Sequence, residues 1–277
     1  MPGSDEIYAA ARTVLLDALE ALEIHRDAMT LVGAQAIYIR VGEADIAVAP
    51  TTTDGDIVFD PEELSVQPAL DELLRSAGFE RKRDETHGAL PGIWEKRVES
   101  GYLVSVDLLI PEAVALKKGR RAARLDGHET GAVLKVRGLE GALVDADVMT
   151  VEGEDGRSFD MRIAGPAALL VAKLHKILDR TNANDRLRDK DALDVFRLLR
   201  GTDAADMAAR ARGILSDARA RETAAVAFDQ MPELFGRADG DGVAMAIRGS
   251  SGLMPSAEVS GSLIALTGEL GIAMRST

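Results

Sequence analysis

Residues 51–59 read Thr-Thr-Thr-Asp-Gly-Asp-Ile-Val-Phe, and the rest of the chain is expected to be organised around this stretch. Asp54 and Asp56 run directly into three apolar residues, which is typical of a buried strand. In a strand the two carboxylates face the same side, about 6.7 Å apart along the chain. They repel each other unless a cation or ligand compensates them. The alternative is a turn, which the Asp-Gly dipeptide by itself favours.

The composition is that of a globular protein. The chain of 277 residues suits one large domain or two modest ones, and 46% of it is hydrophobic. The lack of cysteine excludes disulfides, thiolate metal sites and a thiol nucleophile, and it fits a reducing, cytoplasmic compartment. The sequence shows no signal-peptide pattern and no apolar run of about 18 residues, so no membrane span is expected.

The net charge of −13 is unevenly distributed along the chain. Residues 75–137 carry 13 basic and 9 acidic side chains, a net charge of +4, and residues 173–200 carry 8 and 5, a net charge of +3. Basic segments inside an acidic chain are consistent with a surface that faces phosphates. Random clustering explains the pattern equally well.

The order of expected elements indicates an α/β (α+β) fold followed by helices. In the first half the hydrophobic pattern and the turn residues predict helices at 4–25, 35–41 and 61–77, and strands at 29–32, 54–59, 79–83, 93–98, 103–110, 131–137 and 144–151. In the second half they predict helices at 165–180, 189–200, 204–215, 218–228 and 255–273, with a Gly-rich loop at 236–252. We therefore expect an α/β domain over residues 1–164 and a helical domain over residues 165–277.

Three other positions in the first half can join the acid pair. Gly33 and Ala34 lie where an apolar strand turns into a helix, and small residues there let backbone N–H groups approach a phosphate. Asp107 lies within an apolar strand, where a charge is costly unless it is paired or lies at the rim of the sheet. Together Asp54, Asp56 and Asp107 could hold one or two Mg²⁺ ions that bridge the phosphates of a nucleotide.

In the helical half, Lys173 borders the apolar stripe of its helix, and Arg180 follows seven residues later on the same face. Such a lysine can extend to solvent along the apolar surface, or it can reach into a cleft and bind phosphate. Asp191 and Asp194 share one helical face. Capping and dipole matching at the start of a helix is the alternative role for acids in this segment.

Other catalytic patterns are missing from the sequence. The four histidines show no metal-ligand spacing, and there is no Gly-x-Ser-x-Gly turn, Walker loop or Gly-x-Gly-x-x-Gly motif. A second acid pair, Asp239 and Asp241, is flanked by glycines and is interpreted as a loop.

These features together resemble a known family. The segments 32–36 and 53–57, followed by Asp107, resemble the signature of the DNA-polymerase-β-like nucleotidyltransferase fold. With Lys173, Arg180 and Lys190-Asp191 added, residues 28–200 resemble the AbiEii/MenT family of nucleotidyltransferase toxins, which belong to bacterial toxin–antitoxin systems.

The resemblance implies a mixed sheet with flanking helices, and Mg²⁺-dependent transfer of a nucleoside monophosphate from an NTP. In some members the acceptor is tRNA, and a cognate antitoxin neutralises the toxin. The residues that it assigns to nucleotide and phosphate contacts are Gly33, Ala34, Thr53, Lys173 and Arg180. The residues that it assigns to Mg²⁺ are Asp54 and Asp56, with Asp107 as the third acid of the wider fold. Asp191 is expected to act on the acceptor as a base or an orienting group.

The chain departs from the family pattern at two points. Ala34 replaces the usual second Gly or Ser of the first motif. The first 74 residues are strongly acidic, so contact with tRNA would have to come from the basic segments 117–124 and 180–190. Two other functions stay open: a small-molecule (antibiotic) nucleotidyltransferase, and a non-catalytic binding module with a degenerate nucleotide site.

Overall fold

The computed structural model describes residues 4–42, 44, 46, 52–99, 101–115, 121–180 and 185–276. The contacts divide the chain into two compact units, and neither is continuous in sequence. The first unit comprises Met1–Ala36, Thr51–Val136 and Ala146–Ile163, and the second comprises Ile37–Pro50, Arg137–Asp145 and Ala164–Thr277. The division into domains at residue 164 stays a prediction.

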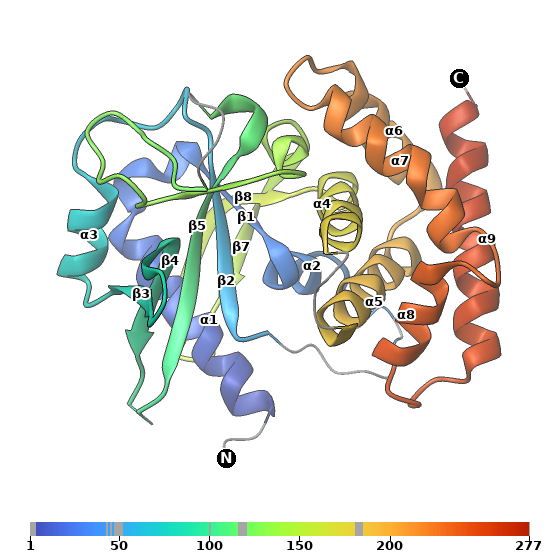
Figure 1. Cartoon of the computed structure of the whole chain (residues 1–277), viewed down its shortest axis with the longest axis horizontal. Helices are drawn as coiled ribbons and strands as arrows, with labels where there is room; N and C mark the ends of the chain where they lie inside the picture. Colours follow the sequence, from blue (N-terminus) through green and yellow to red (C-terminus); the bar gives the residue numbers. More distant parts are fainter. Residues whose placement is uncertain are drawn as a thin grey trace. The chain divides into compact units, whose positions relative to one another are not determined.

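The first unit is built on a mixed sheet (Figure 1). Its strands are β1 (Met29–Val32), β2 (Asp54–Phe59), β3 (Glu80–Asp84), β4 (Gly88–Arg97), β5 (Leu103–Pro111), β6 (Leu134–Val136), β7 (Ala146–Glu152) and β8 (Ser158–Ala164). They lie in the order β3-β4-β5-β2-β1-β8-β7, and β6 pairs with β5. Strand β2 is antiparallel to β1 and parallel to β5. The helices beside this sheet are α1 (Ser4–Ala21), the start of α2 (Gly33–Val41) and α3 (Leu70–Ser76). The predicted α/β class is confirmed.

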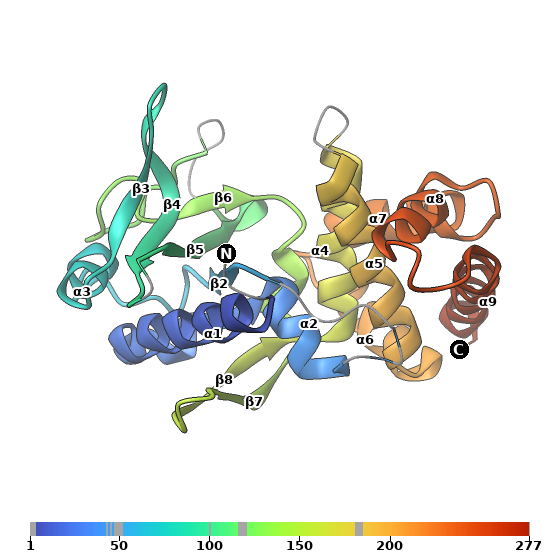
Figure 2. The same ribbon diagram turned by 90° about the horizontal axis from the view of Figure 1, so that it is seen from below.

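Helix α1 covers one face of the sheet with its apolar side (Figure 2). Leu15 and Leu19 have no exposed surface, and Leu15 packs against Gly55 in β2. A Cβ at position 55 would lie 2.9 Å from Leu15 Cδ1, so a side chain there would displace the end of Leu15. Because successive residues of a strand face opposite sides, Asp54 and Asp56 point to the other face of the sheet.

The second unit is helical. Its main helices are α4 (Pro166–Asp179), α5 (Asp185–Gly201), α6 (Ala204–Ser216), α7 (Arg221–Phe235), α8 (Asp241–Gly249) and α9 (Ser256–Arg275). Pro166 starts α4, where a missing N–H costs nothing, and the Asp145 carboxylate accepts the Ala168 N–H at 3.0 Å. In the part of the chain that the structure describes, no helix is long and apolar enough to cross a membrane.

Two sequence-based predictions of secondary structure were wrong, and one strand was missed. The helix expected at 61–77 is reduced to α3, which begins after Pro68, a residue whose missing N–H disfavours a helix interior. Strand β8 was missed, although Phe159, Met161 and Ile163 alternate with polar residues as a half-buried strand requires. The Gly-rich stretch expected to be a loop contains α8.

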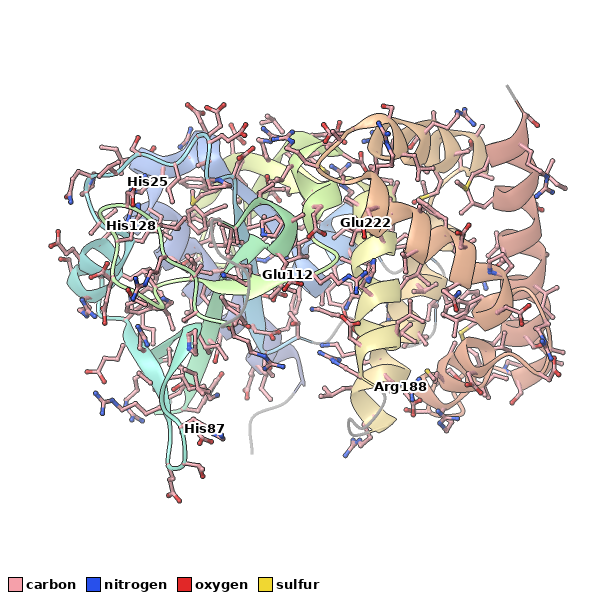
Figure 3. All side chains as sticks on the ribbon, turned by 45° about the horizontal axis from the view of Figure 1, so that its top comes forward. His25, His87, Glu112, His128, Arg188 and Glu222 are labelled. Carbon is pink, nitrogen blue, oxygen red and sulfur yellow. The ribbon has the colours of Figure 1, made fainter. Side chains whose placement is uncertain are left out.

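Two histidines of the first unit lie against each other (Figure 3). The ring centroids of His25 and His128 are 6.0 Å apart. His25 Nε2 lies 2.9 Å from the Pro68 carbonyl oxygen, and His128 Nδ1 accepts the Leu70 N–H at 3.1 Å, at the start of α3. Burial is the main cause that holds the pKa of His128 below its ordinary value, and the charge of His25 is the second. The nearby Asp71 acts in the opposite direction and raises this pKa.

The protein is expected to lose stability as the pH falls from 7.5 to 5.5. The neutral His128 contributes stability fully above its unfolded pKa of about 6.5, and this is lost as the pH falls from there toward the lower folded pKa. His128→Asn should lose less free energy of unfolding over this range in urea titrations. His87→Asn, at an exposed position, is the control. An equal loss in the wild type and His128→Asn contradicts the prediction.

Candidate active site

The acid pair of β2 meets a third carboxylate on the neighbouring strand. Asp56 pairs in register with Asp107 of the parallel strand β5 and with Val32 at the end of β1. Asp54 pairs in the same way with Ser105. Directly paired residues share a face of the sheet, so Asp54, Asp56 and Asp107 lie on the face opposite α1. The strand predicted at 54–59 is confirmed, and the alternative of a turn is wrong.

Gly33 lies directly against the Asp56 carboxylate. Its φ of +73° places it in the left-handed region, and a Cβ there would lie 2.8 Å from Asp56 Cγ and overlap Oδ2. Gly33 is also the first residue of α2, and the next residue, Ala34, is buried. The start of a helix carries partial positive charge, which favours a carboxylate or a phosphate at this position.

A buried network holds the first acid of the pair. The Thr52 hydroxyl donates to Asp54 Oδ1 at 2.7 Å, and Gln35 Nε2 donates to the Asp54 carbonyl at 3.1 Å. Arg12 Nε in turn donates to Gln35 Oε1 at 2.7 Å. All three supporting side chains are buried, so they fix both the backbone and the carboxylate of Asp54.

The sequence analysis singled out Thr53 and missed Thr52. Thr53 is exposed, whereas Thr52 is buried and bonds to the acid two residues on. Thr53 lies at a bend directly before β2, so the hydrogen bond from Thr52 to Asp54 depends on the local backbone, which the sequence pattern did not indicate.

No group of three or more Asp, Glu, His or Cys side chains within the described residues is arranged to hold a metal ion. Mg²⁺, however, is usually bound through one or two carboxylates, with water and substrate phosphates as the other ligands. Asp54 and Asp56 supply such a pair of oxygen donors on one face of β2. The residues present therefore fit a Mg²⁺ ion that binds together with a nucleotide.

The second unit contains a buried cluster of charges around Lys173 of α4. Lys173 Nζ lies 2.9 Å from Asp191 Oδ1 and 2.7 Å from Asp194 Oδ2, both on α5. Arg180 donates to the other oxygen of Asp191 at 2.6 Å, and its side chain keeps 31% of its surface exposed. Lys173, Asp191 and Asp194 are all buried. Lys173 therefore does not extend to solvent, and its ammonium group is already paired with two carboxylates.

Each charge in this cluster holds its partner ionised. Burial by itself would lower the pKa of Lys173, but Asp194 and Asp191 more than offset this and raise the pKa above its ordinary value. Burial would raise the pKa of Asp191, but the charges of Lys173, Lys176 and Arg180 hold it below its usual range. Asp191 is therefore a carboxylate at neutral pH.

The predicted site residues fall into two groups. Gly33, Ala34 and the three acids belong to the first unit, with Thr53 exposed beside them. Lys173, Arg180 and Asp191 come together in the second unit. The convergence of the two groups on one ligand stays a prediction. Residues 117–120 and 181–184 of the two basic segments lie outside the described residues.

The second acid pair differs from the first. Asp239 forms an ion pair with Arg237 at 2.7 Å, and Asp241 begins α8. The expected loop therefore covers Asp239 but ends at the start of a helix.

Comparison with known proteins identifies the family. A family model described as "Nucleotidyltransferase" matches residues 11–214, which include every predicted site residue. The chain belongs to this nucleotidyltransferase family. The protein is accordingly a nucleotidyltransferase, an enzyme of the class that transfers nucleoside monophosphate groups. The narrower toxin family suggested by the sequence remains a resemblance.

One solved structure similar to the chain is an antigenic nucleotidyltransferase-like protein from Paracoccidioides brasiliensis. The two share 14% sequence identity, with a TM-score of 0.42 over 83% of this chain and 91% of the other. None of the curated proteins matches the chain.

Gly33→Ala is expected to lower the free energy of unfolding by about 2 kcal/mol more than Gly42→Ala. Both glycines have positive φ, but a Cβ at Gly42 meets nothing within 4 Å, whereas at Gly33 it overlaps Asp56. The control therefore measures the backbone strain, about 1 kcal/mol, and the difference measures the overlap. Urea unfolding of both variants provides the comparison, and equal losses would show that Asp56 does not restrict this position.

Lys173→Met is expected to lower the free energy of unfolding by about 3–5 kcal/mol, because it leaves buried carboxylates without their cation. Lys176 lies three residues further along α4 and is half-buried, so Lys176→Met should lower the free energy of unfolding by less than about 1 kcal/mol. Urea titrations of both variants test this. If Lys173→Met is as stable as the wild type, the buried carboxylates do not depend on Lys173 for their compensation.

Proposed function

We propose that this nucleotidyltransferase transfers a nucleoside monophosphate from an NTP to tRNA in a Mg²⁺-dependent reaction, as the toxin of a toxin–antitoxin system. The observation that carries the chemical part is the alignment of Asp54, Asp56 and Asp107 on one face of the sheet, with Asp56 against Gly33 at the start of α2. The tRNA acceptor and the antitoxin rest on the resemblance of residues 28–200 to the toxin family, and a cytoplasmic location rests on the lack of cysteine.

The acids are proposed to hold the metal. Asp54 and Asp56 would bind Mg²⁺ together with the NTP phosphates, and Asp107 would be a third carboxylate beside them. When bound, Mg²⁺ neutralises negative charge on the phosphates that accept the attacking oxygen. The hydrogen bond from Thr52 keeps the Asp54 carboxylate in one orientation before the ligands arrive.

The strand-to-helix turn is proposed to receive phosphates. The N–H groups at Gly33 and Ala34 begin α2, where the helix dipole favours an anion. Thr53 is exposed beside the acid pair, so it can contact a nucleotide without any rearrangement of the core.

The buried cluster is proposed to act through its exposed edge. Arg180 is the partly exposed cation of the cluster, so it is the member that can reach a phosphate most readily. Lys173 would contribute a fixed positive charge from within. Asp191 has a lowered pKa and is therefore a weak base near neutral pH, which favours an orienting role toward the acceptor over proton abstraction.

Labelled NTPs incubated with the protein, Mg²⁺ and total tRNA are expected to transfer label to RNA, and EDTA should stop the transfer. Asp54→Asn and Asp56→Asn should each reduce the rate at least about 100-fold, because each removes a metal ligand worth several kcal/mol in the transition state. Asp239→Asn is the matched control, since this acid belongs to the other Asp-Gly-Asp sequence.

The transfer assay and a growth assay together separate the alternative functions. Label on an aminoglycoside-type hydroxyl with none on RNA would replace the tRNA acceptor by a small molecule. Growth inhibition that survives Asp56→Asn would show that the biological effect does not depend on catalysis. Absence of label on RNA, protein and small molecules would contradict the proposed reaction.

A further inference from the structure

Helix α3 and the strands β3 and β4 lie side by side in the first unit (Figure 1). Residues at the end of α3 and on these strands line an open groove. Its volume is about 470 Å³. Arg75, Arg81 and Arg83 contribute three guanidinium groups to its lining, and Glu80 and Glu129 contribute two carboxylates. The lining therefore carries one more positive than negative side chain, on a chain whose net charge is −13.

Arg75 is the one arginine of the three that is fully engaged with carboxylates. It forms an ion pair with Asp71 at 2.8 Å and another with Glu129. The hydrogen bond that Arg75 donates to the Glu129 carboxylate, opposed by desolvation, raises the pKa of Arg75 above its ordinary value. Arg75 is therefore an exposed residue of the lining whose ion pair orients Glu129.

Arg81 and Arg83 keep donors for a ligand. Arg81 is only 13% exposed, and it reaches Glu129 at 3.5 Å and the carbonyls of Thr130 and Ala89 at 3.3 and 3.4 Å. These bonds are long, and the buried Nε of Arg81 has no acceptor. The exposed side chain of Arg83 forms no ion pair or hydrogen bond with any part of the chain that the structure describes.

The chemistry of these donors selects the ligand. A guanidinium carries five N–H donors in a plane, and it binds phosphate or carboxylate through two parallel hydrogen bonds. A carboxylate is planar and meets one guanidinium well. A phosphate presents oxygens in several directions, so it can accept from Arg81 and Arg83 together.

The groove lies apart from the acid pair. Arg81 pairs with Trp94, Trp94 with Val106, and Val106 with Gly55, so these four positions form a row across the sheet. Gly55 faces α1, whereas Asp56 faces the other side. Arg81 is therefore three strands from β2, roughly 14 Å, and on the opposite face of the sheet. A nucleotide held by the acids would not reach it.

We propose that this groove is a second phosphate-binding site, in which Arg81 and Arg83 donate to the ligand and Arg75 and Glu129 hold the site in place. The phosphate belongs either to a small free anion or to the backbone of an RNA strand. The site requires neither Mg²⁺ nor the acid pair.

Binding in EDTA tests the site independently of the transfer reaction. Pyrophosphate is titrated by calorimetry, and a fluorescein-labelled 12-nucleotide RNA is titrated by anisotropy, both at low ionic strength. At least one probe should bind the wild type, and Arg81→Gln/Arg83→Gln should weaken it about tenfold or more. Arg237→Gln/Arg275→Gln, which removes the same charge from the second unit, should bind like the wild type.

The two probes distinguish the sources of the phosphate. If the site serves RNA, the double variant should also lower the salt dependence, with a log–log slope smaller by about 1.4 for two lost contacts. If it serves a free anion, pyrophosphate binding alone should fall. Arg83→Gln is the second variant, because its side chain supports nothing in the described fold, and it should weaken binding about threefold or more. The proposal is overturned if neither probe binds at millimolar concentration, or if the Arg81/Arg83 variants bind like the wild type.

Discussion

The close approach of the Asp56 carboxylate to the Gly33 backbone is the constraint on which the first unit depends. The register of β1 with β2 places Val32 opposite Asp56, and the chain turns into α2 at the next residue. A side chain at position 33 would occupy the space of the carboxylate. One arrangement therefore combines the strand pairing, the left-handed turn and the position of the acid at the start of a helix. Asp56 and its neighbouring acids repel each other, and a bound cation would relieve this repulsion.

The second unit compensates its buried carboxylates with cations of its own chain. Lys173 and Arg180 compensate Asp191 and Asp194 within the fold itself, at distances of 2.6–2.9 Å. Such a cluster gives little net stability when intact but is strongly destabilising when one member is removed. Loss of activity in a variant of this cluster consequently has to be separated from loss of folding. Its use in catalysis rests on the partly exposed Arg180 rather than on the buried ammonium.

Local patterns predicted much of this architecture. An acid pair that runs into apolar residues defined β2, and family membership agrees with the chemistry that the pair suggested. Periodicity could not give contacts between distant residues, such as the support of Asp54 by Gln35 and Arg12. The choice between Thr52 and Thr53 depended on where the extended chain begins, which composition does not encode. The groove around Arg81 was equally hidden, because only strand pairing brings its residues together.

Titration with Mn²⁺, followed by electron paramagnetic resonance of the free ion, tests the central claim that Asp54 and Asp56 bind a divalent cation with the nucleotide. In the presence of a non-hydrolysable NTP, the wild type should bind one or two Mn²⁺ ions per chain beyond those held by the nucleotide alone. Asp56→Asn should abolish this binding, whereas Asp239→Asn should retain it. Equal binding by the wild type and Asp56→Asn would contradict the account.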